Sequence, residues 1–148
     1  MIRSEEDVKK METLSNFFSE CFYSQFGIYP RIWYDVATEK HTLKAEVIRS
    51  VTNIALEIEY PKQYPKGIAD RRRDRELVIY RQYYFYLCMK KTSSTLQRTG
   101  RTIGNYNHAT VLHGIKCIQK ILDTNDKLGM HIIKSVDLQL IRYMRENQ

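Results

Sequence analysis

His113 and Cys117 are the side chains in this 148-residue sequence whose types and spacing come closest to a metal-binding pair. They stand four residues apart, so a helix would place both on one face. A zinc site needs further ligands, and no second pair stands at ligand spacing. A nucleophile drawn from the 11 tyrosines would need a metal-binding histidine cluster, and none is visible. We therefore expect no metal, no cofactor and no enzymatic activity.

The polar side chains His108, Thr110 and His113 stand at the start of a predicted helix and can face a partner. Asn107, a favourable N-cap residue, precedes this helix, whose apolar residues fall on another face. A shorter helix comes before it and stops at Gly104, a residue type that tolerates the left-handed conformation at helix ends. Two helices joined by a short turn containing glycine form the helix-turn-helix pattern. In this pattern the second helix presents its N-terminal residues to the DNA major groove.

The positive charge of the chain is concentrated next to this pattern. The formal net charge is +7. Residues 62–101 carry 11 basic and 3 acidic side chains, a net charge of +8, whereas residues 1–61 have a net charge of −3. A solvated basic face is one interpretation. Because the basic stretch leads into a recognition-type helix, a nucleic-acid-binding surface is the interpretation we favour.

Composition limits the class of protein. A hydrophobic fraction of 43% allows a core. No apolar run is long enough to cross a membrane, and the acidic, polar start is unlike a signal peptide. The three cysteines are scattered, which fits buried thiols in a reducing compartment better than disulfides. We expect a cytoplasmic protein, encoded by a bacterium or a phage.

Hydrophobic periodicity predicts an all-α fold of about six helices. The expected helices are residues 4–24, 42–60, 74–91 and 131–145, together with the two helices of the helix-turn-helix. Ser4 is expected to cap the first helix, and Ser94 the first helix of the pair. Residues 32–38 are ambiguous between a short strand and a helical turn. The chain divides into an N-terminal helical extension, residues 1–60, and a DNA-binding domain, residues 61–148.

Two of these helices have unusual apolar residues. The first has an apolar stripe, typical of a helix that packs one face on a core. The stripe consists of Val8, Met11, Leu14, Phe18 and Phe22, widened by Phe17 and Cys21. The helix at 74–91 contains Tyr80, Tyr83, Tyr84 and Tyr86. Aromatic side chains near a basic patch can stack on unpaired bases. We prefer a packed helix surface with a few tyrosine hydroxyls in water.

Three groups of residues between positions 71 and 118 fit one family pattern without a gap in the match. They are the basic loop Arg72-Arg73-Asp74-Arg75, the pair Arg81-Gln82, and the helix start His108-Ala109-Thr110-Val111-Leu112-His113, with Leu87, Leu96, Gly100, Ile103 and Gly104 between them. Together they resemble the C-terminal DNA-binding domain of the bacterial chromosomal replication initiator DnaA. The resemblance implies a helix-turn-helix of the Trp-repressor-like type that binds double-stranded DNA.

The resemblance also implies roles for individual residues. It places Arg73 in the minor groove and the start of the recognition helix in the major groove. The implied base-reading residues are Arg73, Asn107, His108 and Ala109. The implied phosphate-binding residues are Arg72, Arg75, Arg81, Gln82, Thr110 and His113.

The sequence departs from the family pattern at the base-reading edge. Tyr106 stands where the family has arginine, Asn107 where it has aspartate, and Ala109 where it has threonine. An aspartate accepts a hydrogen bond from cytosine N4, whereas asparagine can pair with adenine, and alanine offers thymine only a methyl group. We therefore expect a preserved scaffold with altered base preference.

The large ATPase module of the family has no counterpart in this sequence. No G-x-x-x-x-G-K-[ST] motif is present, so we expect no ATP binding and a free-standing DNA-binding domain. Two hypotheses remain. In the first, the protein binds duplex DNA sequence-specifically, in control of replication initiation or transcription, and is phage- or plasmid-derived. In the second, it is an adaptor that contacts a replication protein through its N-terminal helices, with a degenerate DNA domain.

Overall fold

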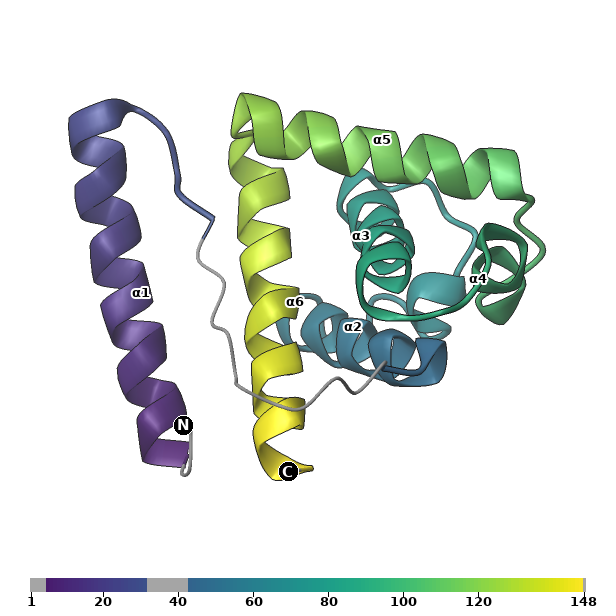
Figure 1. Ribbon diagram of the computed structural model, residues 1–148, viewed down its shortest axis with the longest axis horizontal. Coiled ribbons are helices and arrows are strands. Elements are labelled where there is room, and N and C mark those ends of the chain that lie inside the picture. The colour runs from purple at the N-terminus through teal and green to yellow at the C-terminus, as the bar shows by residue number, and fades with distance from the viewer. Residues whose placement is uncertain (1–4, 32–42, 148) are drawn as a thin grey trace.

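The computed structural model describes residues 5–31 and 43–147, and all of its regular elements are helical. In chain order they are α1 (Glu5–Phe26), α2 (Ala45–Glu59), the 3-10 helix η1 (Gly67–Ala69), α3 (Arg75–Lys91), α4 (Leu96–Thr102), α5 (His108–Thr124) and α6 (Lys127–Glu146) (Figure 1). The predicted all-α fold is confirmed for this part of the chain. None of these helices has the length and apolar character needed to cross a membrane.

Side-chain caps account for two of the differences from the predicted boundaries. Thr95, and not Ser94, caps α4, because the Arg98 N–H donates to Thr95 Oγ1 at 3.1 Å. α6 begins four residues earlier than position 131, because Asp126 Oδ2 accepts from the Gly129 N–H at 2.9 Å. The predicted cap at position 4 and the ambiguous segment 32–38 lie outside the described residues.

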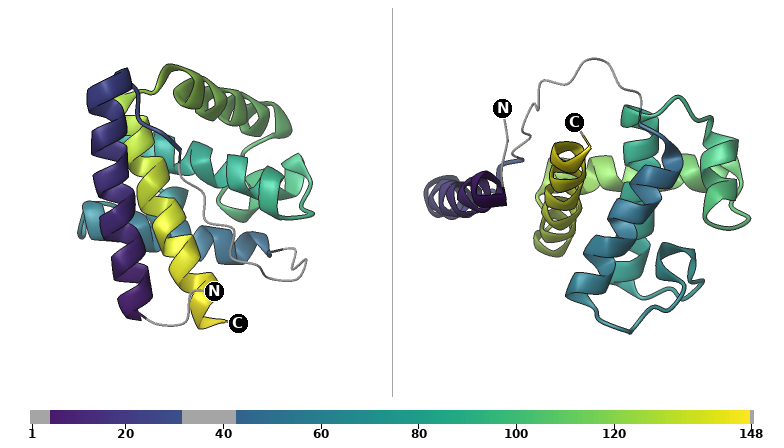
Figure 2. Two further views of the ribbon diagram at one scale, coloured as in Figure 1. Left: turned by 60° about the vertical axis from the view of Figure 1, so that its left-hand side comes forward. Right: turned by 90° about the horizontal axis from the view of Figure 1, so that it is seen from below.

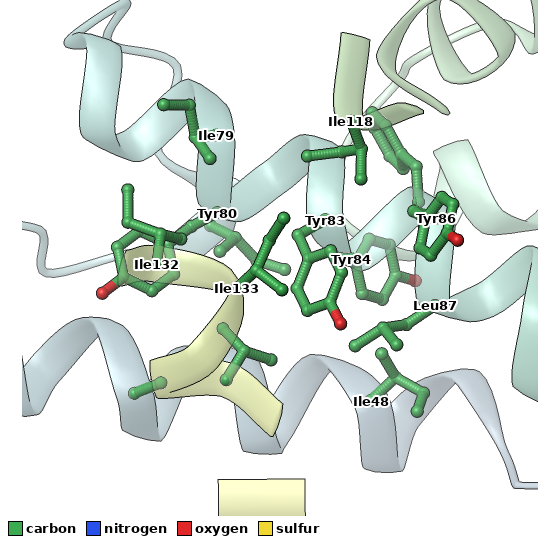
Figure 3. Close-up of a cluster of buried hydrophobic side chains, with 14 of the residues drawn as sticks. Ile48, Ile79, Tyr80, Tyr83, Tyr84, Tyr86, Leu87, Ile118, Ile132 and Ile133 are labelled. Atoms are coloured by element: carbon green, nitrogen blue, oxygen red, sulfur yellow. The ribbon is translucent and has the colours of Figure 1, made fainter. Parts of the chain in front are cut away.

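α3 is the central helix of the fold. It contacts α2, α4, α5 and α6, and 10 of its 17 residues are buried. A helix covered on all sides has no polar face, which explains why its sequence shows no clean amphipathic period. Figure 3 shows its tyrosines among Ile48 of α2, Ile118 of α5, and Ile132 and Ile133 of α6.

The tyrosines of α3 form part of this core and cannot stack on nucleic-acid bases. Tyr80, Tyr83 and Tyr84 have no exposed surface, and Tyr86 is almost fully covered. The preferred interpretation of a packed helix is therefore right, but the expectation that hydroxyls reach water is wrong. The Tyr83 hydroxyl donates to Asp137 Oδ1, and the Tyr84 hydroxyl lies 3.4 Å from the Thr99 carbonyl oxygen.

α2 packs into the same core as the DNA-binding domain. Its buried residues Ile48, Val51, Ala55 and Leu56 belong to one hydrophobic cluster with α3, α5 and α6. The predicted boundary between residues 60 and 61 therefore does not coincide with a break in the core. Within the predicted extension, α1 is the helix that lies apart from this cluster.

α1 lies along the outer side of α6, away from α4 (Figures 1 and 2). Val8 packs on Ile141, and Glu5 pairs with Arg142 at 3.0 Å and with Arg145 at 2.8 Å. Of the predicted apolar stripe, Val8 and Met11 at its N-terminal end pack against α6, and the middle of the stripe does not. Its members Leu14, Phe17 and Phe18 are exposed, and the buried residues of α1 are Val8, Ser15 and Ser19.

Asp137 of α6 is a buried carboxyl whose protonation should affect stability. Burial raises its pKa to about 7, opposed by the Tyr83 hydrogen bond and by the charges of Arg31 and Lys91. Between roughly pH 4 and 7 the folded protein therefore holds a proton that the unfolded chain has released, and the free energy of unfolding should fall as pH rises. The slope can reach about 1.4 kcal/mol per pH unit for one proton.

Chemical unfolding followed by circular dichroism across this pH range will measure the effect. We expect Asp137→Asn to remove most of the dependence, because the amide does not ionise. Asp123→Asn, at an exposed carboxylate of α5, should leave it unchanged. An identical pH dependence in wild type and Asp137→Asn would contradict the assignment.

Candidate DNA-binding surface

α4, the turn at residues 103–107 and α5 form the helix-turn-helix. Asn107 caps α5 as predicted: its Oδ1 accepts from the Thr110 N–H at 2.9 Å and from Thr110 Oγ1 at 3.1 Å. At Gly100 the turn passes so close that a Cβ would overlap the Tyr106 carbonyl oxygen. Only glycine fits there, so the turn is held tightly against α4.

α5 presents two different faces. Val111, Ile115 and Ile118 are buried against the core, and at Gly114 the helix lies close on α3. A Cβ at Gly114 would stand 2.9 Å from the Phe85 ring, so a larger residue would push the helices apart. The predicted base-reading residues His108 and Ala109 are exposed on the other face. Asn107, Thr110 and His113 are exposed there as well.

In the structure the basic loop spans residues 70–74, because Arg75 is already the first residue of α3, and it exposes Arg71, Arg72 and Arg73. Arg73 makes no hydrogen bond or ion pair with the residues that the structure describes, so its guanidinium is available to a partner. Arg72 lies over the Tyr64 ring at 4.5 Å and pairs weakly with Asp70 at 3.7 Å.

The remaining predicted phosphate-binding residues differ in the contacts that they already make within the protein. Arg75 forms an ion pair with Asp126 at 2.9 Å. Gln82 is half-buried beside Gly114. His113 Nε2 lies 3.4 Å from Cys117 Sγ on the exposed side of α5. Over the described ranges 5–31 and 43–147, no group of three or more His, Cys, Asp or Glu side chains could hold a metal ion.

Arg81, which the resemblance implied to bind phosphate, is buried. Only 7% of its surface is exposed. Its Nε donates to the Ile68 carbonyl at 3.1 Å, and its Nη2 donates to the carbonyls of Asp70 and, at 3.4 Å, Arg72. Arg81 thus binds the backbone of the basic loop from the side of α3. These hydrogen bonds fix the positions of the exposed arginines of the loop.

Tyr106 connects this loop to the helix-turn-helix, and sequence reasoning missed that role. The guanidinium groups of Arg81 and Arg71 lie 5.3 and 5.6 Å from the centre of its ring, both within cation–π range. The ring also meets Phe85 of α3 edge-on at 5.9 Å. The available signal was the departure from the family pattern at this position. Arg71 was missed too, although it belongs to the same run of arginines.

Arg81→Ala should destabilise the fold. The substitution leaves the carbonyls of Ile68, Asp70 and Arg72 without their charged donor and a void beneath them, so we expect a loss of about 2–4 kcal/mol. Gln82→Ala, at the half-buried neighbour, should cost less than about 1 kcal/mol. Urea unfolding followed by circular dichroism measures both. An Arg81→Ala variant as stable as wild type that bound all DNA sequences equally weakly would support the phosphate-binding role instead.

Sequence comparisons match the same region of the chain. The family model described as "Bacterial dnaA protein helix-turn-helix" matches residues 58–118. The chromosomal replication initiator protein DnaA of Ehrlichia ruminantium is 44% identical over 57 residues, which is 38% of this chain and 12% of that protein. DnaA of Porphyromonas gingivalis is 29% identical over 90 residues, 61% of this chain and 18% of that protein. DnaA of Latilactobacillus sakei is 36% identical over 70 residues, 45% and 16% respectively.

The matched residues include the elements that form the candidate surface. They contain η1, the basic loop, α3, α4 and much of α5. The chain spans less than a fifth of the length of these relatives. The resemblance found in residues 71–118 is confirmed, because residues 58–118 of this chain match the family model of the bacterial DnaA helix-turn-helix.

Proposed function

We propose that this chain binds double-stranded DNA sequence-specifically, in control of replication initiation or of transcription. The observation that carries the proposal is that Arg81 and Tyr106 join two exposed regions, the start of α5 and the basic loop. The N-terminal end of α5 and the arginine loop project from one rigid unit, because Arg81 and Tyr106 hold the loop against the turn. Such preorganisation lowers the entropic cost of binding a surface with two contact regions.

The two edges take different grooves in this proposal. The exposed start of α5 enters the major groove, where helix N-terminal residues reach base edges. Arg73, whose guanidinium is unpaired among the described residues, enters the adjacent minor groove, where negative potential attracts arginine. Arg72, Arg75, Gln82, Thr110 and His113 contact phosphates, and Arg81 positions the loop. The charge of +8 over residues 62–101 supports this arrangement.

The cap of α5 constrains how Asn107 reads a base. A backbone N–H can only donate, so the side-chain atom that faces the Thr110 N–H is the amide oxygen. That oxygen also accepts from Thr110 Oγ1, which leaves the Nδ2 group to face the partner. Bidentate pairing with adenine uses both the oxygen and the nitrogen of an amide. While α5 stays capped, Asn107 therefore acts as a donor and favours acceptors such as guanine O6 and N7 or thymine O4.

Binding should depend strongly on salt. With about four to six phosphates neutralised, the logarithm of affinity should fall against the logarithm of salt concentration with a slope of roughly −4 to −5. Fluorescence anisotropy with a labelled random duplex, titrated at several sodium chloride concentrations, measures the slope. An affinity that does not change with salt, or no binding to the duplex at low salt, would refute DNA binding as the function.

Asn107→Asp should change base preference without affecting the fold. Aspartate can keep the cap with one oxygen, while its second oxygen replaces a donor with an acceptor. At the contacted position we expect the preferred base to change from one that presents an acceptor to cytosine, whose N4 donates. The preference should change by about 1–3 kcal/mol.

Selection of bound sequences from a random duplex pool, carried out with both proteins, gives the result. Circular dichroism provides the control, since both variants should unfold at similar temperatures. Identical selected sequences would show that Asn107 reads no base. A failure of both proteins to bind any duplex would reject the proposed function itself.

A further inference from the structure

α1 is packed with its apolar side outward. The side that faces α6 buries Val8 together with two small polar residues, Ser15 and Ser19. Leu14 and Phe17 are 67% and 70% exposed, and Phe18 is 50% exposed. A surface helix normally buries its apolar stripe and exposes polar residues. The orientation of α1 on α6 therefore leaves the larger apolar surface without a partner in the described part of the chain.

The exposed residues form one continuous stripe. Leu14, Phe17, Phe18 and Cys21 are separated by three or four positions, which places them on one side of the helix. The Phe18, Phe22 and Phe26 rings extend it, with centroids 5.7 and 4.6 Å apart in succession. With about 150–250 Å² for each aromatic side chain, the exposed apolar area is roughly 400–500 Å². The largest apolar patch on a typical monomer has about this size and is often functional.

The stripe carries almost no charge. Glu20 is the one ionisable acid or base among Asp, Glu, Lys and Arg between residues 13 and 28. Interface cores are depleted in charged residues and enriched in aromatic ones. A two-fold axis brings a surface against its own copy, so an uncharged apolar stripe is complementary to itself. A partner with a strongly basic or acidic surface would find no opposite charge here.

We propose that α1 pairs with α1 of a second copy of this chain through the stripe formed by Leu14, Phe17, Phe18 and Cys21. α1 lies on the opposite side of α6 from α4, so pairing there leaves both candidate DNA-binding surfaces uncovered (Figure 1). Two such stripes bury roughly 800–1,000 Å², which is less than the about 1,200 Å² of the smallest stable interfaces and falls in the range of weak, transient ones. The dimer is therefore weak and concentration-dependent, and two adjacent DNA sites strengthen it through effective concentration.

Sedimentation velocity from low to several hundred micromolar protein tests the proposal without DNA, so its outcome is independent of the proposed function. We expect a concentration-dependent dimer in the wild type. Leu14→Glu and Phe17→Glu should raise the dimer dissociation constant by about 30-fold or more. Lys9→Gln changes the charge of the same helix by the same single unit, but outside the stripe, and should dimerise like the wild type. Both substituted stripe residues are exposed, so circular dichroism should show an unchanged fold.

Alkylation of Cys21 supplies a second readout that needs no substitution. Cys21 is exposed and lies within the stripe, so its modification, mapped by mass spectrometry, should slow as protein concentration rises. A protein that stays monomeric with constant Cys21 reactivity overturns the proposal. So does a dimer that persists unchanged in Phe17→Glu, because it would form through another surface.

Discussion

The buried guanidinium of Arg81 is the interaction on which the candidate DNA-binding surface depends. Burying a cation is costly unless its donors are satisfied, and here the carbonyls of Ile68, Asp70 and Arg72 satisfy them. The same bonds fix the path of a loop whose neighbouring arginines repel one another. Arg81 projects from α3, which is packed against α2, α4, α5 and α6. The bonds of Arg81 therefore hold the loop rigidly on the core.

Tyr106 extends this rigidity to the recognition helix. Two guanidinium groups lie near its ring, which also meets Phe85 edge-on, one residue before the cap of α5. A loop and a helix separated by some thirty positions in the sequence are thereby held as one surface. Tyr106, which departs from the family pattern, thus helps to hold the loop and the recognition helix together. A different base preference can then arise at positions 107 and 109 without disturbing this arrangement.

Hydrophobic periodicity does not predict how α1 and α3 pack, for two different reasons. α3 has no clear apolar side because α2, α4, α5 and α6 surround it, and its tyrosines fill the core. α1 has a clear apolar side, yet beyond Val8 and Met11 that side faces outward, while Ser15 and Ser19 are buried. A periodic pattern establishes that a helix has an apolar side. It does not establish which neighbour, in the same chain or in another copy, covers it.

Local interactions explain how much could be predicted from the sequence. Features that depend on residues a few positions apart could be predicted from the sequence. They are the all-α fold, the helix-turn-helix, the Asn107 cap and the concentration of basic charge. The family pattern adds the candidate surface residues on the same basis.

Three features could not be predicted from neighbouring residues. They are the burial of Arg81, the contact of Tyr106 with two arginines and the outward stripe of α1. Each depends on which distant segment lies alongside, and that is settled by how the helices pack around α3. Arg81 illustrates the difference. In the sequence it is one more cation in a basic stretch, and in the folded chain it is the donor that satisfies the carbonyls of the loop above it.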